Sequence, residues 1–299
     1  MNRICVMLSS YNGENYIEQQ LQSLYEQKGV EVDIIVRDDG SKDGTLDILR
    51  RWEAEGKLKW YAGENLGWAM SFMHLLVNSS EYDYYSFCDQ DDIWQEDKLA
   101  TAVATLQQAQ SGPACYFSNL TYWKEGVPQR KVFIPAPYFD RHTCLVQCPC
   151  YGCTMVFNKD LADIIKNNPP QKVSAHDFWV FQVANLVGKV YYDDNAYMLY
   201  RQHGNNQEGA LRSARDIWKR RLTKSLNALS LHPMERNAEQ LRTLYGAHMS
   251  EETLEIVSGI ADYRKTFASY LRLLFSRKYV MQRAQNTFWL KLKVLLRRL

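Results

Sequence analysis

Short apolar runs alternate with amphipathic stretches along the first two hundred residues. An apolar run without polar alternation predicts a strand that is covered on both faces, and apolar residues at every third or fourth position predict a helix. Strands are predicted at 4–8, 32–36, 58–61 and 84–88, and helices at 17–25, 46–52 and 68–77. This alternation is typical of a parallel α/β sheet, in which ligands bind at the carboxyl ends of the strands.

The pattern becomes less regular after residue 94. A region rich in Pro and aromatic residues is expected to be irregular as far as Tyr138. The other predicted elements are helices at 95–110, 161–165 and 174–186 and strands at 114–118, 154–157, 190–192 and 196–200. From about Ala210, helical periodicity rich in Arg carries no strand signal. We therefore expect an α/β domain over 1–208 and an all-helical region over 209–299.

Composition limits the classes of function. The chain of 299 residues is 46% hydrophobic and 23% charged, as in ordinary globular proteins, and its formal net charge of +2 gives no argument for a nucleic-acid partner. The apolar run after Met1 is too short for a secretory signal, and no stretch approaches the ~18 apolar residues of a membrane span. We expect a cytoplasmic protein.

Seven cysteines, an odd number, are expected to be free thiols in a reducing compartment. Four of them cluster at Cys144, Cys148, Cys150 and Cys153. Their spacing lacks the two separated C-x-x-C pairs of common structural zinc sites, so free thiols are favoured over zinc. The role of this cluster stays open.

The last segment, 279–299, has the pattern of a basic amphipathic helix. Trp and Leu side chains are interspersed there with Arg and Lys, a pattern that can lie on an anionic membrane surface. A terminal helix that packs on its own domain, with a solvated basic face, explains the pattern equally well. Membrane association, packing and dimerisation are therefore alternative roles for this segment.

Polar residues follow three of the predicted strands. They are Tyr11-Asn12, Asp38-Asp39 and the sequence from Asp89 to Asp92. Three carboxylates within four positions after a buried strand cost stability unless a positive charge lies near, and a divalent cation that holds a diphosphate meets this need. The alternative is that Asp92 caps a helix that begins near Gln95.

These motifs, with three later ones, resemble the family 2 glycosyltransferases of GT-A fold. The nucleotide-binding half is matched by Ser9-x-Tyr11-Asn12, Asp38-Asp39-Gly40-Ser41-x-Asp43-Gly44-Thr45, Asn65-x-Gly67 and Asp89-x-Asp91-Asp92. Similarity to the bacterial rhamnosyltransferase branch rests on Asp89-Gln90-Asp91-Asp92-Ile93-Trp94, Gly152-Cys153-Thr154-Met155, His176-Asp177-x-Trp179 and Tyr200-Arg201-Gln202-His203-Gly204-x-Asn206. The resemblance covers about 3–208. It implies a mostly parallel central sheet with flanking helices, to which the C-terminal helical extension is added.

The resemblance implies a nucleotide site at the ends of the strands. Asp39 would accept a hydrogen bond from the N3–H of a pyrimidine base, and Tyr11 would stack near that base. An alternative role for Asp38 is to orient its loop. The complete nucleotide-binding set is Ser9, Tyr11, Asn12, Asp38, Asp39 and Asp89.

The resemblance also implies a divalent metal, Mn²⁺ or Mg²⁺, between the protein and the two phosphates. Asp91 is the preferred direct ligand, and His203 completes the shell, which favours Mn²⁺ because imidazole is a softer donor than water. Asp89 faces the ribose or the metal, and Asp92 is a second ligand or a cap. Which of the three carboxylates touches the metal stays open.

Asp177 matches the general base of inverting members of the family. Such a base takes the proton of the acceptor hydroxyl from the face opposite the departing diphosphate. A helix N-cap is the alternative, since Asp177 precedes an apolar helix. The sugar or acceptor pocket is expected to include Trp94, His176, Trp179 and Arg201. Trp179 would stack on an apolar sugar face, and Arg201 would neutralise phosphate or form a structural ion pair.

The implied function is an inverting, metal-dependent transfer of L-rhamnose from dTDP-β-L-rhamnose to a lipid-linked saccharide. The product would be an O-antigen or capsule-type bacterial cell-surface polysaccharide, and the enzyme would act at the inner face of the membrane. A UDP-hexose or UDP-N-acetylhexosamine donor is the first alternative, because pyrimidine contacts are shared. The second is a catalytically silent subunit that binds nucleotide sugars. The acceptor, the linkage position and the oligomeric state do not follow from the sequence.

Overall fold

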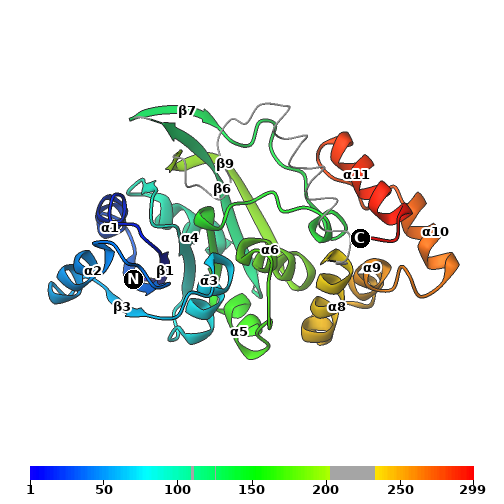
Figure 1. Ribbon diagram of the computed structural model, residues 1–299, viewed down its shortest axis with the longest axis horizontal. Helices are drawn as coiled ribbons and strands as arrows, with labels where there is room; N and C mark the ends of the chain where they lie inside the picture. The colour runs from blue at the N-terminus through cyan, green and yellow to red at the C-terminus, as the bar shows by residue number, and fades with distance from the viewer. Residues whose placement is uncertain (109–110, 125, 203–232) are drawn as a thin grey trace. The chain divides into compact units, whose positions relative to one another are not determined.

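The computed structural model describes residues 1–108, 111–124, 126–202 and 233–299. These residues form two compact units, which are described separately (Figure 1). Unit 1 comprises Met1–Pro137 and Cys148–Arg201, and unit 2 comprises Tyr138–Gln147 and Gln202–Leu299.

Unit 1 is built on one sheet. In the described residues this sheet has nine strands in the order β3-β2-β1-β4-β8-β6-β9-β5, with β7 paired to β6. Figure 1 labels β1, β3, β6, β7 and β9. The strands are β1 (Arg3–Ser10), β2 (Glu31–Asp38), β3 (Lys59–Ala62), β4 (Tyr84–Cys88), β5 (Ile93–Trp94), β6 (Ala114–Lys124), β7 (Val127–Lys131), β8 (Met155–Asn158) and β9 (Lys189–Arg201). The helices are α1 (Ile17–Tyr25), α2 (Thr45–Ala54), α3 (Trp68–Asn78), α4 (Lys98–Gln108), α5 (Lys159–Asn167) and α6 (His176–Val187).

The strands β3, β2, β1 and β4 run parallel to one another. Leu8 of β1 pairs with both Val36 of β2 and Cys88 of β4, so these three strands end at the same edge of the sheet. The polar residues that follow them therefore meet at that edge. Beyond β4 the sheet becomes mixed, because β8 runs antiparallel to both β4 and β6. The predicted α/β architecture is confirmed.

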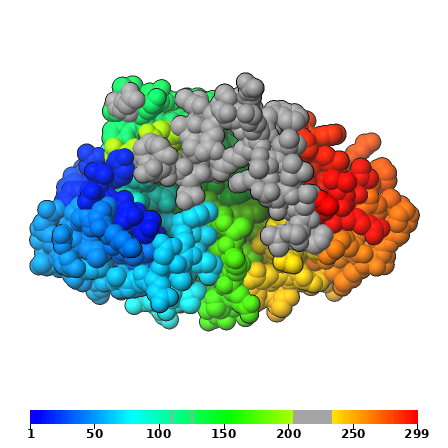
Figure 2. Space-filling model, viewed as in Figure 1, coloured from blue at the N-terminus to red at the C-terminus, as the bar shows by residue number. Residues whose placement is uncertain are grey.

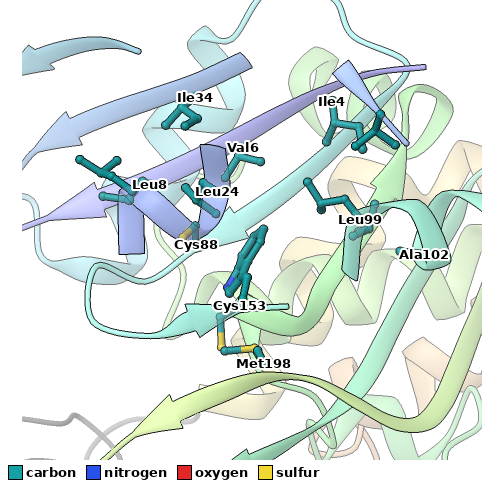
Figure 3. Close-up of a cluster of buried hydrophobic side chains, with 14 of the residues drawn as sticks. Ile4, Val6, Leu8, Leu24, Ile34, Cys88, Leu99, Ala102, Cys153 and Met198 are labelled. Carbon is teal, nitrogen blue, oxygen red and sulfur yellow. The ribbon is translucent and has the colours of Figure 1, made fainter. Parts of the chain in front are cut away.

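Helices cover both faces of this sheet. Val6 and Leu8 of β1 lie in a buried cluster with Leu24 of α1 on one face (Figure 3). On the other face α3 contacts β1, α5 and α6, and Phe72 of α3 packs edge-on against Phe87 of β4. Because both faces are buried, the central strands carry the continuous apolar runs that made them recognisable in the sequence.

Two predictions for unit 1 were wrong. The region expected to be irregular extends β6 to Lys124 and returns as β7, with Gly126 at φ +82° in the turn. Pro128 is accommodated because β7 is an edge strand among the described residues. The two short strands predicted at 190–192 and 196–200 form one strand, β9. Its pairing with β6 shifts register around Asn119, which accommodates the polar residues between the two predicted strands.

Unit 2 is helical. Its helices are α8 (Pro233–Tyr245), α9 (Glu251–Ala261), α10 (Phe267–Phe275) and α11 (Ala284–Leu295). Ser250 caps α9 by accepting a hydrogen bond from the Thr253 N–H, and Thr266 forms a capping box with Ser269 at the start of α10. Within the described ranges, each helix is too short or too polar to cross a bilayer.

The segment Tyr138–Gln147 groups with unit 2, although it precedes the predicted boundary between 208 and 209. The Gln147 side chain accepts a hydrogen bond of 2.6 Å from the Gln282 N–H, 135 residues away. The His142 ring stands edge-on to Tyr279 at 5.1 Å. Periodicity along the chain cannot predict contacts at such a separation. The predicted boundary itself lies outside the described residues.

Candidate active site

Asp38 organises the loop that follows β2. Its buried carboxylate accepts hydrogen bonds from the N–H groups of Gly40 and Ser41 at 3.0 and 2.7 Å. It also accepts from the hydroxyls of Ser10 and Ser41 at 2.9 and 2.5 Å. A carboxylate has about four acceptor positions, so these bonds leave none for a nucleotide. The geometry favours the loop-orienting role of Asp38 over direct nucleotide contact.

Asp39 ties this loop to the start of α3. Its carboxylate accepts from the N–H groups of Leu66 and Gly67 at 2.8 and 2.9 Å and pairs with the guanidinium of Arg37. Asp39 and Arg37 are only 3% and 2% exposed. The Asn65 side chain donates to the Asp39 carbonyl oxygen at 3.0 Å. The motif Asn65-x-Gly67 is therefore folded around Asp39, which explains why the two motifs occur together.

The turn after β1 lies between the two acidic loops. The Tyr11 backbone forms two hydrogen bonds with the Gln90 side chain, at 2.9 and 3.1 Å. Asn12 adopts a left-handed φ of +49°, and its side chain accepts from the Lys42 N–H at 2.9 Å. The Tyr11 side chain remains 48% exposed. An exposed ring beside a cross-linked turn is available to stack on a base.

The loop after β4 brings acidic groups close together. Oxygen atoms of Asp89 and Asp92 and the Sγ of Cys153 lie within 4.8 Å of one another. Burial, together with the charges of Asp91 and Asp177, raises the pKa of Asp89 to about 7. Burial and the charges of Asp91 and Asp89 raise the pKa of Asp92 well above its usual range. Such crowding favours either protonation or a bound cation.

Arg201, at the end of β9, holds this loop in place. Its backbone N–H donates to Asp92 Oδ1 at 3.1 Å, and its side-chain Nε–H donates to the Asp91 carbonyl oxygen at 2.8 Å. The guanidinium lies over the Trp123 ring at 4.1 Å, and burial lowers the pKa of Arg201. Asp92 is therefore bonded to β9. It does not cap a helix, because α4 begins only at Lys98.

Lys98 is a second cation near the loop. It is 1% exposed, its Nζ lies 3.5 Å over the Trp94 ring, and burial lowers its pKa to about 8. In the part of the chain that the structure describes, its Nζ has no hydrogen-bond partner. Lys98 thus contributes charge from within the core without bonding a carboxylate directly.

Asp177 lies in the first turn of α6. The N-cap position is Ala175, and the Asp177 carboxylate accepts from the Phe178 N–H at 2.7 Å. The alternative assignment of Asp177 as the N-cap residue was wrong. Its charge raises the pKa of Asp89, so the two carboxylates lie within electrostatic range of each other. The start of α6 therefore influences the charge of the acidic loop.

Three residues predicted to line the sugar or acceptor pocket are buried. His176 is 3% exposed, its ring lies 4.1 and 4.6 Å from those of Phe72 and Phe87, and burial lowers its pKa to about 3. Trp94 and Trp179 are 3% and 1% exposed. All three side chains lie in the core of unit 1, and this geometry gives no support to stacking of Trp179 on a sugar.

Two further predicted residues need separate mention. The Ser9 hydroxyl is hydrogen-bonded to that of Ser71 in α3 at 2.6 Å, so it links β1 to α3. His203 lies outside the described residues.

The acidic loop fits a hard divalent cation. Asp92 Oδ2 is buried and has no hydrogen-bond partner in the described part of the chain. Carboxylate oxygens suit Mg²⁺ and Mn²⁺, whereas burial keeps Cys153 a thiol by raising its pKa well above the usual range. The carboxylates are therefore the better ligands. All seven cysteines are free thiols, and no three of them are close enough to hold a metal in the described residues.

Sequence comparison identifies the family. The family model described as "Glycosyl transferase family 2" matches residues 5–164. The chain belongs to glycosyltransferase family 2. The "dTDP-rhamnosyl transferase RfbG" of Shigella flexneri is 33% identical over 252 residues, which cover 75% of this glycosyltransferase and 84% of that protein. The putative teichuronic acid biosynthesis glycosyltransferase TuaG of Bacillus subtilis is 31% identical over 158 residues, 51% of this chain and 60% of TuaG.

Solved structures share the fold of this family 2 glycosyltransferase. Staphylococcus aureus TarS 1–349 in complex with UDP-GlcNAc aligns with 91% of this chain and 84% of its own, at a TM-score of 0.57 and 20% identity. The mannosyltransferase PcManGT of Pyrobaculum calidifontis, in complex with GDP-Man and Mn²⁺, aligns with 99% and 85%, at a TM-score of 0.51 and 17% identity. The predicted GT-A fold with additional C-terminal helices is confirmed.

Sequence reasoning did not single out three residues of this glycosyltransferase that shape the site. The sequence contains a pattern that could have identified Arg37, because it is a charged residue at the end of an apolar strand. Helical spacing could have identified Lys98, since it lies four positions before Ala102 on the buried side of α4. No sequence pattern could have identified Gln90, because only the fold shows that its side chain forms hydrogen bonds with the Tyr11 backbone.

Proposed function

We propose that the chain is an inverting, metal-dependent glycosyltransferase that moves L-rhamnose from dTDP-β-L-rhamnose to a lipid-linked saccharide. The observation that carries the chemistry is the approach of Asp177, from α6, to the acidic loop after β4. A base and a cation site within electrostatic range of each other meet the two needs of a single displacement. The rhamnose donor is supported by the similarity to the dTDP-rhamnosyl transferase of Shigella flexneri. The pathway is the synthesis of O-antigen or a related cell-surface polysaccharide.

Asp177 acts as the general base in this proposal. It takes the proton of the acceptor hydroxyl while that oxygen bonds the anomeric carbon and the bond to the diphosphate breaks. Attack from the face opposite the diphosphate inverts the configuration. Asp91, with Asp89, Asp92 and His203, would hold Mn²⁺ or Mg²⁺, whose positive charge would stabilise the leaving diphosphate. Arg201 adds a positive charge beside the same loop.

The nucleotide is held by the first two strand ends. Asp39 accepts from the N3–H of the base, Tyr11 stacks on it, and Asn12 keeps the turn in its left-handed form. Asp38 orients the loop through its four hydrogen bonds. Residues 1–208 form the catalytic domain in this proposal, and the buried Trp94, His176 and Trp179 support its sugar pocket.

Asp177→Asn tests the base. We expect the rate of transfer to fall by about 10²–10⁴-fold, because the amide keeps the size of the side chain but accepts no proton. Binding of Mn²⁺ and dTDP, measured by calorimetry, should be unchanged. Asp47→Asn, at a side chain that is 83% exposed, is the matched control. Undiminished transfer by Asp177→Asn would remove the base assignment.

A donor screen with wild-type protein tests the substrate. dTDP-rhamnose, UDP-glucose and UDP-N-acetylglucosamine are compared for donor hydrolysis and transfer in the presence of Mn²⁺. We expect turnover of dTDP-rhamnose. Turnover of a UDP-sugar with dTDP-rhamnose inert would change the donor, and binding without turnover of any sugar would favour the silent subunit.

We also propose that the region 209–299 binds the anionic inner face of the bacterial membrane, where the lipid-linked acceptor is presented. Residues 263–299 contain ten Lys and Arg and no Asp or Glu. Phe267 and Phe275, two turns apart on α10, are 68% and 75% exposed, and Phe288 of α11 is 63% exposed (Figure 2, orange and red). Exposed aromatic rings among cations are typical of interfacial binding. The predicted apolar face of the last helix is partly packed, because Leu290 and Val294 of α11 are only 4% and 1% exposed.

The double variant Phe267→Ser, Phe275→Ser tests this surface. We expect its partitioning to phosphatidylglycerol vesicles to fall at least about tenfold, because two largely exposed rings lose their apolar insertion. Val127→Ser, at an exposed side chain of unit 1, is the control. Unchanged sedimentation with vesicles would exclude the membrane proposal, and a lower molar mass of the variant in solution would assign the surface to a homodimer instead.

A further inference from the structure

Arg37 is a buried cation in a position that an apolar side chain would ordinarily occupy. It is the next-to-last residue of β2 and is 2% exposed. Burial of an unpaired guanidinium is costly, so its contacts should show what it is needed for. These contacts converge on the residue that is proposed to read the nucleotide base.

One guanidinium connects three elements. Its Nη1 pairs with Asp39 and donates to Ser71 Oγ in α3 at 3.1 Å, and its Nη2 donates to the Glu64 carbonyl oxygen at 2.7 Å. Position 63 has to be glycine for this arrangement, because a Cβ there would lie 2.6 Å from Nη2. The end of β2, the loop after β3 and the first turns of α3 are therefore fixed to one another through Arg37.

The same contacts define what Asp39 can still accept. Of the about four acceptor positions of a carboxylate, Arg37 and the Leu66 N–H occupy two on Oδ1, and the Gly67 N–H occupies one on Oδ2. One position on Oδ2 remains. Uracil and thymine present one N–H donor at N3, whereas the N3 of cytosine is an acceptor. A carboxylate held in this way distinguishes the two kinds of pyrimidine.

We propose that Arg37 is a positioning residue for nucleotide recognition, which holds Asp39 and the Glu64–Gly67 loop so that a uridine or thymidine diphosphate is selected over a cytidine diphosphate. This inference rests on the proposed role of Asp39 in binding the base. Arg37 does not touch the nucleotide. It acts through Asp39 and through the backbone N–H groups that its contact with Glu64 keeps in place.

Arg37→Lys keeps the positive charge, but a lysine ammonium lacks the planar guanidinium that bonds all three acceptors of Arg37 at once. We expect its Kd for dTDP and UDP and its KM for the donor to rise by about tenfold or more, the loss of one to two hydrogen bonds of a charged group. The preference over CDP should fall by a similar factor, and kcat should change much less. Arg50→Lys, in an exposed pair with Asp47, is the matched control.

Ser71→Ala is the milder second variant, because it removes one Arg37 contact and leaves Asp39 paired. We expect a smaller loss of the same kind, with little change in melting temperature. If both variants keep the wild-type Kd values and the preference over CDP while only the melting temperature falls, Arg37 is merely structural and the inference is overturned.

Binding assays separate this inference from the proposed activity. A wild-type protein that turns over no nucleotide sugar, but prefers dTDP and UDP over CDP through Arg37, would contradict the activity and support the positioning role. A wild-type protein that shows no preference over CDP would overturn the role of Asp39 and this inference together.

Discussion

The acidic loops after β2 and β4 lie on the two sides of β1, yet their charges are balanced differently. At the end of β2, four donors satisfy Asp38, and Asp39 is paired with Arg37 and two backbone N–H groups. At the end of β4, Asp92 is equally buried, but its Oδ2 has no hydrogen-bond partner in the described residues. Burial and the charges of neighbouring carboxylates raise the pKa of both Asp92 and Asp89.

This difference separates a loop that the chain itself holds in shape from a loop that needs a bound cation or proton. A buried carboxylate whose acceptor positions are filled by the chain fixes the backbone that surrounds it. A buried carboxylate whose neighbours are also carboxylates gains stability only when a proton or a cation arrives. The loop after β2 is therefore held in shape before a ligand binds, with one acceptor position of Asp39 still available, and the loop after β4 is completed by its ligand.

The same substitution should have opposite effects in the two loops. Asp39→Asn leaves the buried Arg37 without its carboxylate and should lower the free energy of unfolding by about 3–5 kcal/mol, the usual cost of breaking a buried ion pair. Asp92→Asn removes a buried charge beside other carboxylates, so the free energy of unfolding of the metal-free protein should stay the same or rise. Urea unfolding in the presence of EDTA measures both.

Asp47→Asn is the control for these two variants, since an exposed substitution should change stability by less than about 0.5 kcal/mol. Similar losses from Asp39→Asn and Asp92→Asn would show that the loop after β4 is as well compensated as the loop after β2. The contrast between the two regions would then be wrong.

Metal binding should stabilise the folded protein only through the loop after β4. At a Mn²⁺ concentration of 100 times its Kd, the free energy of unfolding should increase by about 2.7 kcal/mol in the wild type. Asp91→Asn should lose most of this increase, because it removes the preferred ligand, whereas Asp39→Asn should retain it. Urea unfolding with and without Mn²⁺ gives the comparison. Equal loss in both variants would mean that the two loops bind the metal as one unit.

The sequence predicted which strand ends carry the polar residues, and the family resemblance assigned the nucleotide to the loop after β2 and the metal to the loop after β4. Apolar runs and helical periodicity gave the strand ends correctly, because both signals are local. The donors that distinguish the loops come from elsewhere: Gly67 reaches Asp39 across 28 residues, and Arg201 reaches Asp92 across 109. Local patterns cannot predict such partners, so the sequence left open both the role of Asp38 and which of Asp89, Asp91 and Asp92 touches the metal.

The burial of two predicted pocket residues could not be foreseen for a related reason. Trp94 and Trp179 belong to motifs on which the family resemblance rests, and both lie in the core. Neighbours on a strand or in the first turn of a helix point in different directions, so proximity in sequence does not imply a shared surface. The continuous strand β9 was missed because polar residues interrupt its apolar pattern.

The smallest predicted effect on stability is the pH dependence that Lys98 contributes. Burial lowers its pKa to about 8 from an ordinary 10.5. Between these pH values the unfolded chain holds a proton that the folded protein has lost, so this group makes stability rise with pH, by up to about 1.4 kcal/mol per pH unit. Lys98→Met should lack this contribution, which appears as the difference between the two stability profiles in urea from pH 7.5 to 10.

Lys28→Met, at an exposed side chain, should follow the wild type. Parallel wild-type and Lys98→Met profiles would show that the amine stays charged in the folded protein, and a charged amine beside Asp92 would make the loop after β4 a compensated loop like the one after β2.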